Sequence, residues 1–259
     1  MCSSDLCTDN WYNRAIQEKN KWDTYVAKQS GPTNQELPSY AHAVGAVYRN
    51  ADSSDIVVTA AGGLVGEVVQ IWKPKELNTF ETEWGFSCMG YEISGALGIK
   101  MAKPNQDVIV FVGDGSYLLQ NSDIYSSIMY DKKLIIVVCD NGGHMVINRL
   151  QLAKGGKEYL CNLRSARASN IQFVDFEAHA KSMGANAETV KSTSELEAAF
   201  KRAKKSDKTY VISMLTHGYE WLDGSAFWES PTLEIHSTEE NKKAYAEFID
   251  GKNKQRKGV

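Results

Sequence analysis

The sequence predicts an α/β protein built on a parallel β-sheet with helices on both faces. Short runs of continuous apolar residues alternate with longer segments of helical periodicity, which is typical of parallel strands that are buried on both sides. Turns rich in small or polar residues follow several of these runs directly. The chain has 259 residues, of which 42% are hydrophobic, so it is long enough to bury one large core.

The predicted elements follow one another in a regular order. A polar helix over residues 9–30 is expected to lie on the surface of a neighbouring module, and a second helix begins near residue 38. The predicted strands cover residues 56–58, 108–112, 134–139, 187–190 and 210–215, and the helices between them cover residues 64–72, 89–101, 121–130, 174–183 and 194–205.

Three regions are expected along the chain. Residues 1–36 form an N-terminal extension, residues 37–216 form the α/β domain, and residues 217–259 form a C-terminal extension in which the alternation is lost. Ligands of open parallel sheets bind at the carboxyl ends of the strands. The loops that follow the predicted strands are therefore the places to look for a site.

The composition excludes several classes of protein. The formal charge is -3, and the one cationic run, residues 252–257, is predicted to be a solvated chain end, so we expect no nucleic-acid binding. No segment is apolar and long enough to cross a membrane, and residues 1–10 lack the apolar stretch of a secretion signal. The five cysteines lack the paired spacing of a metal site. We therefore expect a cytoplasmic protein with reduced thiols.

Two polar loops directly follow neighbouring strands of the predicted sheet. Residues 113–116 (Gly-Asp-Gly-Ser) follow one strand, and residues 140–143 (Asp-Asn-Gly-Gly) follow the next. Asp114, Asn141 and the backbone carbonyl of Gly143 could supply three oxygen ligands of the kind that Mg²⁺ prefers. Glycines let the backbone approach a diphosphate, and the start of a following helix offers free N–H groups to it. The alternative is a pair of ordinary strand-end turns.

This pair of loops resembles the signature of thiamine-diphosphate enzymes, in which Gly-Asp-Gly is followed one strand later by Asn. The resemblance implies the diphosphate-binding (PP-type) fold of that family, with thiamine diphosphate and Mg²⁺ as cofactors. It implies that Asp114, Asn141 and Gly143 bind the metal. It also implies cofactor contacts from Gly113, Gly115 and Ser116.

Two further segments resemble the same family. Residues 84–91 (Trp-Gly-Phe-Ser-Cys-Met-Gly-Tyr) are similar to the segment that holds the thiamine, with Ser87, Cys88 and Met89 at the cofactor. The resemblance implies that Met89 props the cofactor into a bent shape and that the Ser87 carbonyl accepts a hydrogen bond from its 4′-amino group; core packing is the alternative for Met89. Residues 59–64 resemble the first diphosphate loop, and the alternative there is a strand-to-helix turn without a ligand. The expected contacts of this loop come from Ala61, Gly62 and Gly63.

Within the family, residues 83–92, 113–122 and 149–167 favour the trihydroxycyclohexanedione hydrolases of inositol degradation over acetolactate synthase or pyruvate decarboxylase. The closing stretch, residues 217–228, also resembles that group. This resemblance implies hydrolytic opening of a cyclic, polyol-derived 1,2-diketone. One departure is that Gly-Gly-His follows Asn141, where the family usually has His-Gly and an aromatic residue. A substrate role for His144 therefore stays open, with an ordinary loop histidine as the alternative.

Four charged residues near these segments also stay open. Arg164 and Arg167 could meet a hydroxylated substrate or a partner domain, or could be surface charges. Glu83 and Glu92 each lie beside a cofactor segment, where each could instead serve a helix cap or a salt bridge.

The resemblance also implies a missing half. In this family a second domain holds the aminopyrimidine and supplies the activating glutamate, and the resemblance here begins near residue 37. We therefore expect a split subunit or a piece of a longer enzyme, which works as an oligomer with a pyrimidine-domain partner, and we assign no catalytic residue. The alternatives are a subunit of another thiamine-diphosphate lyase or decarboxylase, similar to acetolactate synthase, and a cofactor-binding module without turnover.

Overall fold

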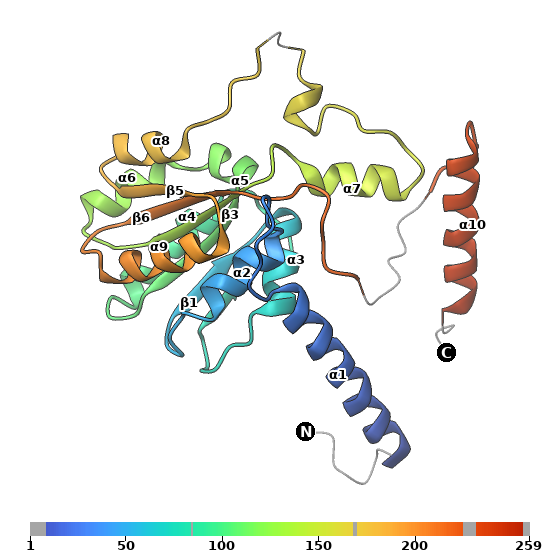
Figure 1. Cartoon of the computed structure of the whole chain (residues 1–259), viewed down its shortest axis with the longest axis horizontal. Helices are drawn as coiled ribbons and strands as arrows, with labels where there is room; N and C mark the ends of the chain where they lie inside the picture. The colour runs from blue at the N-terminus through green and yellow to red at the C-terminus, as the bar shows by residue number, and fades with distance from the viewer. Residues whose placement is uncertain (1–8, 84, 168–169, 225–231, 256–259) are drawn as a thin grey trace.

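The computed structural model describes residues 9–83, 85–167, 170–224 and 232–255, and Figure 1 shows the chain. Trp84 and part of the 217–228 stretch lie outside the described residues. The centre is a six-stranded, fully parallel sheet in the order β2-β1-β3-β4-β6-β5, which confirms the predicted fold class. The strands are β1 (Ile56–Thr59), β2 (Phe80–Thr82), β3 (Val108–Gly113), β4 (Ile135–Asp140), β5 (Asn186–Val190) and β6 (Tyr210–Leu215).

Helices cover both faces of this sheet, and each face has its own apolar core. Because successive side chains of a strand point to opposite faces, Ile109 and Phe111 of β3 enter one core while Val110 enters the other. The first core lies under α2 (Tyr40–Tyr48), α3 (Gly62–Ile71) and α9 (Thr193–Lys205). The second lies under α4 (Tyr91–Ala102), α6 (Ser122–Met129) and α8 (Phe176–Ser182).

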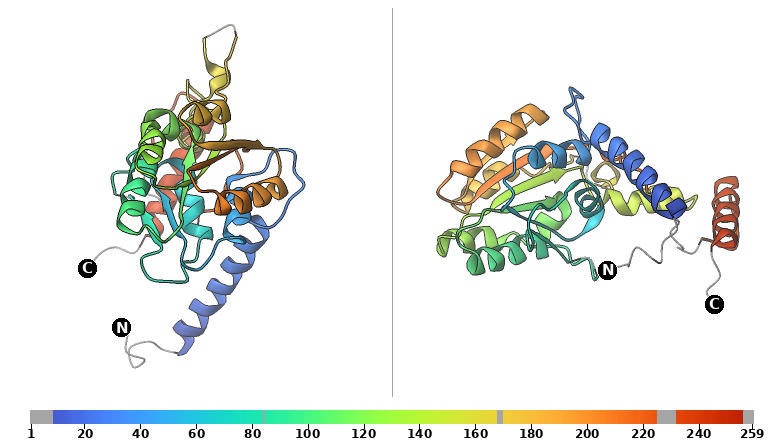
Figure 2. Two further views of the ribbon diagram at one scale, coloured as in Figure 1. Left: turned by 90° about the vertical axis from the view of Figure 1, so that its left-hand side faces the viewer. Right: turned by 90° about the horizontal axis from the view of Figure 1, so that it is seen from below.

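Two helices lie outside the layers that cover the sheet (Figures 1 and 2). In Figures 1 and 2, α1 (Asp9–Gln29) projects from the body, and its buried residue Val26 lies near the C-terminal end that meets the core. The polar α10 (Glu239–Lys254) lies beside the turn that follows α7 (Met145–Ala153), where the Asn241 amide donates to the Gly155 carbonyl at 2.7 Å (Figure 1). Within the described ranges, the structure has no helix that is both long and apolar enough to cross a membrane.

An ionic cluster fixes the amino ends of the central strands. Lys204, near the end of α9, contacts Asp55 at 2.6 Å and Asp107 at 2.9 Å, and these carboxylates immediately precede β1 and β3. Lys133 also contacts Asp107, at 2.8 Å. The strands thus start from a common ionic anchor, and their carboxyl ends carry the loops predicted to bind the cofactor.

Candidate functional site

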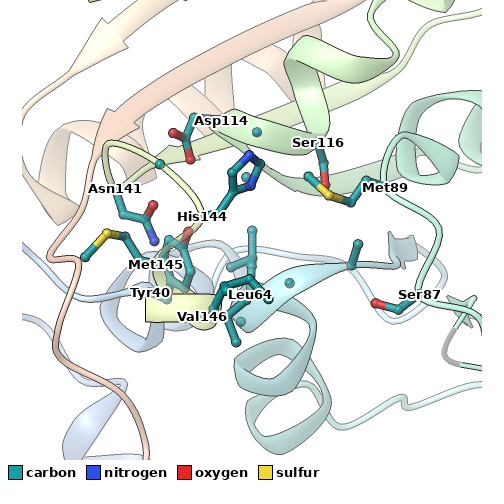
Figure 3. Close-up of a pocket in the computed structure, with 17 residues that line it drawn as sticks. Tyr40, Leu64, Ser87, Met89, Asp114, Ser116, Asn141, His144, Met145 and Val146 are labelled. Atoms are coloured by element: carbon teal, nitrogen blue, oxygen red, sulfur yellow. The ribbon is translucent and has the colours of Figure 1, made fainter. Parts of the chain in front are cut away.

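A cavity of about 320 Å³ opens at the carboxyl ends of the strands (Figure 3). Its walls come from the loops after β1, β3 and β4, from the 87–89 segment, and from the first turn of α7 (Met145–Ala153). Its lining includes every predicted cofactor residue except Cys88, which is exposed to solvent. The predicted residues that line it are Ala61, Gly62, Gly63, Ser87, Met89, Gly113, Asp114, Gly115, Ser116, Asn141 and Gly143.

One end of the cavity carries the predicted metal ligands, and Figure 3 shows Asp114 and Asn141 there together. Asp114 is the first residue of the short helix α5 (Asp114–Leu119) and is buried. Burial raises the pKa of its carboxyl to about 7, the nearby Asp140 carboxylate adds to the rise, and the N–H groups of Gly143 and Gly115 oppose it. The charged form therefore needs a positive partner to be stable at this depth.

The amide oxygen of Asn141 is buried and has no hydrogen-bond partner among the described residues. An unsatisfied buried acceptor costs roughly 1–3 kcal/mol, and this oxygen lies in the cavity lining, where it is available to a metal ion or a hydrogen-bond donor. The Asp140 carboxylate lies close enough to Asp114 that its charge raises the pKa of Asp114 further. A carboxylate and a free amide oxygen are ligands suited to Mg²⁺, so the residues present fit the ion that the sequence predicts.

Gly143 requires its glycine for geometric reasons. Its φ is +142°, a conformation that side chains rarely adopt, and a β-carbon would lie 2.3 Å from the Cys161 carbonyl oxygen. This close approach comes from an antiparallel bridge between Gly143 and Asn162. The bridge holds the 141–143 loop against the segment that follows α7.

The loop after β1 leads directly into α3, a helix of 10 residues. Its N-cap residue is Ala61, which has an extended backbone and cannot accept a capping hydrogen bond through its side chain. The first N–H groups of a helix have no partner within the helix and attract anions. Since Ala61, Gly62 and Gly63 line the cavity, this helix start offers donors to an anionic ligand there.

The opposite end of the cavity is formed by Ser87 and Met89, and Figure 3 shows the Met89 thioether between Ser87 and the acidic end. Met89 is 37% exposed, so it belongs to the cavity wall and not to a sealed core. The Glu83 carboxylate accepts the N–H groups of Phe86 at 2.9 Å and Cys88 at 2.8 Å. In a planar trans peptide, the carbonyl of one residue and the N–H of the next point in opposite directions. Because the Cys88 N–H points to Glu83, the Ser87 carbonyl points away from Glu83.

Glu92 lies behind the cavity and is 1% exposed. Its carboxylate accepts the N–H groups of Ala61 at 3.1 Å and Gly90 at 2.8 Å. Burial raises the pKa of this carboxyl, while these N–H groups and the Ser116 side chain oppose the rise. The bond to Gly90, the N-cap of α4, fits the cap role that the sequence suggested, but the bond to Ala61, 31 residues away, fits neither a cap nor a salt bridge.

Six further residues line the cavity. Leu64 lies in α3 at the end of the 59–64 motif, and His144 is the histidine whose role the sequence left open. The other four were not predicted; they come from the start of α2 and the first turn of α7, and they are Tyr40, Met145, Val146 and Ile147. The α7 residues directly follow the 140–143 motif, and this proximity was the one available signal. Burial raises the pKa of Tyr40 well above its ordinary value.

His144, whose role the sequence left open, lies in the cavity wall between Asp114 and Met89 (Figure 3). Its ring packs on Gly115, where a β-carbon would come within 2.9 Å of it. Its backbone N–H donates to the Cys161 carbonyl at 2.7 Å. By contrast, Arg164 and Arg167 are exposed and do not belong to the described lining of this cavity.

The fold and this cavity together define a domain that binds a diphosphate-bearing cofactor at the carboxyl edge of a parallel sheet. The family model for the C-terminal TPP-binding domain of thiamine pyrophosphate enzymes matches residues 60–214. The chain therefore belongs to this family, as the sequence motifs predicted.

Curated relatives of the chain are 3D-(3,5/4)-trihydroxycyclohexane-1,2-dione hydrolases. The enzyme of Halalkalibacterium halodurans is 38% identical over 200 residues, which cover 75% of this chain and 31% of the relative. The Lacticaseibacillus casei enzyme is 36% identical over 91% of this chain and 37% of its own length. The Bacillus subtilis enzyme is 35% identical over 82% of this chain and 33% of its own length. The chain thus spans about a third of the length of these relatives.

Solved structures with the same fold include two decarboxylases. The thiamine diphosphate-dependent 4-hydroxybenzoylformate decarboxylase of Rhodococcus jostii superposes with a TM-score of 0.62 at 18% identity, covering 71% of this chain and 34% of that one. Benzoylformate decarboxylase from Polynucleobacter necessarius gives a TM-score of 0.60 at 20% identity, and the match covers 74% of this chain and 35% of that one. At these identities the likeness concerns the fold alone.

Proposed function

We propose that this chain is the diphosphate- and Mg²⁺-binding half of a thiamine-diphosphate-dependent hydrolase that cleaves a C–C bond of a cyclic, polyol-derived 1,2-diketone in inositol degradation. The observation that carries the proposal is one cavity with Asp114 and the unpartnered Asn141 amide oxygen at one end and Met89 at the other (Figure 3). The names of the curated relatives support the hydrolase and its diketone substrate. A cytoplasmic location stays a prediction.

The residues of this chain would bind and orient the cofactor. Asp114, Asn141 and the Gly143 carbonyl would hold Mg²⁺, and the N–H groups at the start of α3 would bind the diphosphate. Met89 would prop the two rings, and the Ser87 carbonyl would accept the amino group of the pyrimidine. When bound, thiamine diphosphate supplies a nucleophilic carbon and an electron sink for reaction at a carbonyl.

The activating glutamate is proposed to come from a pyrimidine-domain partner, in an oligomer. Among the described residues that line the cavity, the one carboxylate is Asp114, and its place is at the metal end. The thiamine end is open, since Phe86 is 90% exposed beside it. A second domain seated there would cover the rings and complete the site.

The first test is calorimetric titration of thiamine diphosphate, with and without Mg²⁺, into the chain and its Asp114→Ala variant. We expect Mg²⁺-dependent binding to the wild type and its loss in the variant. Asp175→Ala is the matched control, because Asp175 is the exposed N-cap of α8, away from the cavity, and this variant should bind as the wild type does. Unchanged binding by Asp114→Ala would mean that the metal assignment is wrong.

The substrate is tested separately, with a pyrimidine-domain partner added. A panel of cyclic 1,2-diketones and 2-oxo acids separates the proposed hydrolase from an acetolactate-synthase-like enzyme. Ring opening of a diketone supports the proposal. Turnover of pyruvate alone would reject the hydrolase while leaving the cofactor assignment intact, and binding without any turnover would favour a non-catalytic module.

A further inference from the structure

Glu92 is a buried carboxylate that touches three separate segments of the cofactor site. One carboxylate oxygen accepts the Ala61 N–H at 3.1 Å, from the loop after β1. The other accepts the Gly90 N–H at 2.8 Å, from the segment that carries Ser87 and Met89. The carboxylate also interacts with the side chain of Ser116, in the loop after β3. The three partners are far apart in the sequence and meet at this one side chain.

A local role at the start of α4 does not account for these bonds. A helix cap uses donors within its own first turn, and Gly90, the N-cap of α4, is such a donor. Ala61 lies 31 residues away in the chain, at the N-cap of a different helix, α3. A buried carboxylate is costly unless donors compensate it, so the bonds to Ala61 and Ser116 contribute to keeping Glu92 in place.

A direct role as an anion ligand is also excluded by charge. A carboxylate would repel a diphosphate, and Glu92 does not belong to the described lining of the cavity. Its effect on a ligand must therefore pass through the groups that it holds. Two of these, Ala61 and Ser116, do line the cavity.

Two of the segments that Glu92 joins, the 87–90 segment and the loop after β3 with α5, are also packed against each other. A β-carbon on Gly90 would come within 2.4 Å of the Gln120 β-carbon, at the end of α5. A β-carbon on Gly115 would come within 3.3 Å of the Met89 methyl group. A shift of one of these two segments therefore displaces the other, while the loop after β1 is linked to them through the Glu92 carboxylate.

We infer that Glu92 is a positioning residue, which holds the loops after β1 and β3 and the 87–90 segment in the arrangement that receives the diphosphate of the cofactor. The inference rests on the proposed function for the identity of the ligand. In this role Glu92 aligns the loops of the site and makes no contact with substrate or cofactor.

The test combines hydrogen exchange with binding in the full chain. Glu92→Gln keeps the size of the side chain, but its NH₂ group cannot accept a hydrogen bond, so one of the backbone donors loses its partner. We expect faster exchange, in the ligand-free protein, at whichever of the Ala61 and Gly90 amides faces the NH₂ group. We also expect Mg²⁺-dependent binding of inorganic pyrophosphate to weaken by about tenfold. Pyrophosphate is the probe because it needs no contact at the thiamine end.

Asp55→Asn is the matched control. Asp55 is also a buried carboxylate, 3% exposed, but it lies at the opposite edge of the sheet in the Lys204 ion cluster. This variant should lower the melting temperature without changing exchange at Ala61 or Gly90, or the affinity for pyrophosphate. Glu92→Asp is the second variant, in case Glu92→Gln fails to fold. It retains the charge on a shorter side chain and should fall between wild type and Glu92→Gln.

The outcomes are distinct. If the amides of Ala61 and Gly90 exchange at wild-type rates in the Glu92 variants, the inference is wrong whatever the ligand is. If exchange is faster while pyrophosphate affinity is unchanged, Glu92 supports the fold alone and the inference is also wrong. If the wild type binds neither pyrophosphate nor thiamine diphosphate, the proposed function has failed, and the exchange rates alone then decide whether Glu92 joins the loops.

Discussion

Single residues of the 141–143 loop are constrained by backbone geometry as well as by chemistry. At Gly143 an alanine would combine a φ of +142° with a β-carbon 2.3 Å from the Cys161 carbonyl oxygen. We expect Gly143→Ala to lower the free energy of unfolding by about 1–3 kcal/mol, because the loop must move to relieve the strain. Mg²⁺-dependent cofactor binding should weaken at the same time, since the predicted carbonyl ligand moves with it. Urea denaturation and calorimetry measure the two effects.

The control for this prediction is Gly66→Ala. Gly66 lies within α3, and a β-carbon there would meet nothing within 4 Å. Alanine favours a helix interior over glycine by about 0.5–1 kcal/mol, so this variant should be as stable as the wild type or slightly more stable. Equal losses in both variants would mean that the geometry at Gly143 is not special.

Motif residues could be predicted from the sequence because local order fixes their place. Asp114 and Asn141 directly follow apolar strands, and parallel strands bring such loops together. Tyr40 and the start of α7 could not be predicted in this way, since packing and not a motif brings them to the cavity. The same holds for the role of Glu92, whose partner Ala61 is joined to it only by the fold.

At the scale of elements, the predictable parts were those with a strong apolar pattern. β3 and β4 are buried along almost their whole length, and their continuous apolar runs gave their positions closely. β2 was missed because it is a three-residue edge strand that is only partly buried. The C-terminal extension was predicted without a helix, yet it contains α10, whose polar sequence buries Asn241 and Ala244 and leaves a weak apolar pattern.

The closing segment that leaves β6 is fastened to α3 by a buried acid. Glu67 of α3 is 2% exposed and accepts the Leu222 N–H at 3.0 Å. Burial raises the pKa of this carboxyl to about 7, against the opposing effects of the Leu222 N–H and of Arg149. The ordinary pKa of this carboxyl is 4.5. Between pH 4.5 and about pH 7, Glu67 therefore keeps a proton in the folded protein that it has lost in the unfolded chain. This contribution to stability is present below that window and is lost as the pH rises through it.

We therefore expect Glu67→Gln to remove a pH-dependent part of the stability. When the pH rises from 5 to 8, the free energy of unfolding of the wild type should fall by up to about 3 kcal/mol more than that of the variant. This figure follows from the difference between the pKa of Glu67 in the folded and in the unfolded state. Urea denaturation of both proteins at the two pH values measures this difference. Because other buried carboxyls titrate equally in both proteins, parallel pH profiles would show that Glu67 does not carry a raised pKa.

For the whole molecule, the openness of the cavity decides how much of the cofactor this chain can hold by itself. The metal and diphosphate end is enclosed by buried groups, among them Asp114 and the Asn141 amide oxygen. The end proposed for the thiamine rings is formed by Met89, 37% exposed, beside the exposed Ser87 and Phe86. Apolar surface contributes to binding in proportion to the area removed from water, and half-covered rings remove little.

The isolated chain should therefore bind pyrophosphate and thiamine diphosphate with affinities that differ by less than about tenfold, both in the presence of Mg²⁺. A pyrimidine-domain partner should tighten thiamine diphosphate by a much larger factor, because it covers the rings, and should leave pyrophosphate nearly unchanged. Calorimetric titration of both ligands, with and without the partner, measures the four affinities. Equal tightening of both ligands would indicate that the partner reshapes the diphosphate end, and a large preference for thiamine diphosphate without the partner would indicate that this chain already encloses the rings.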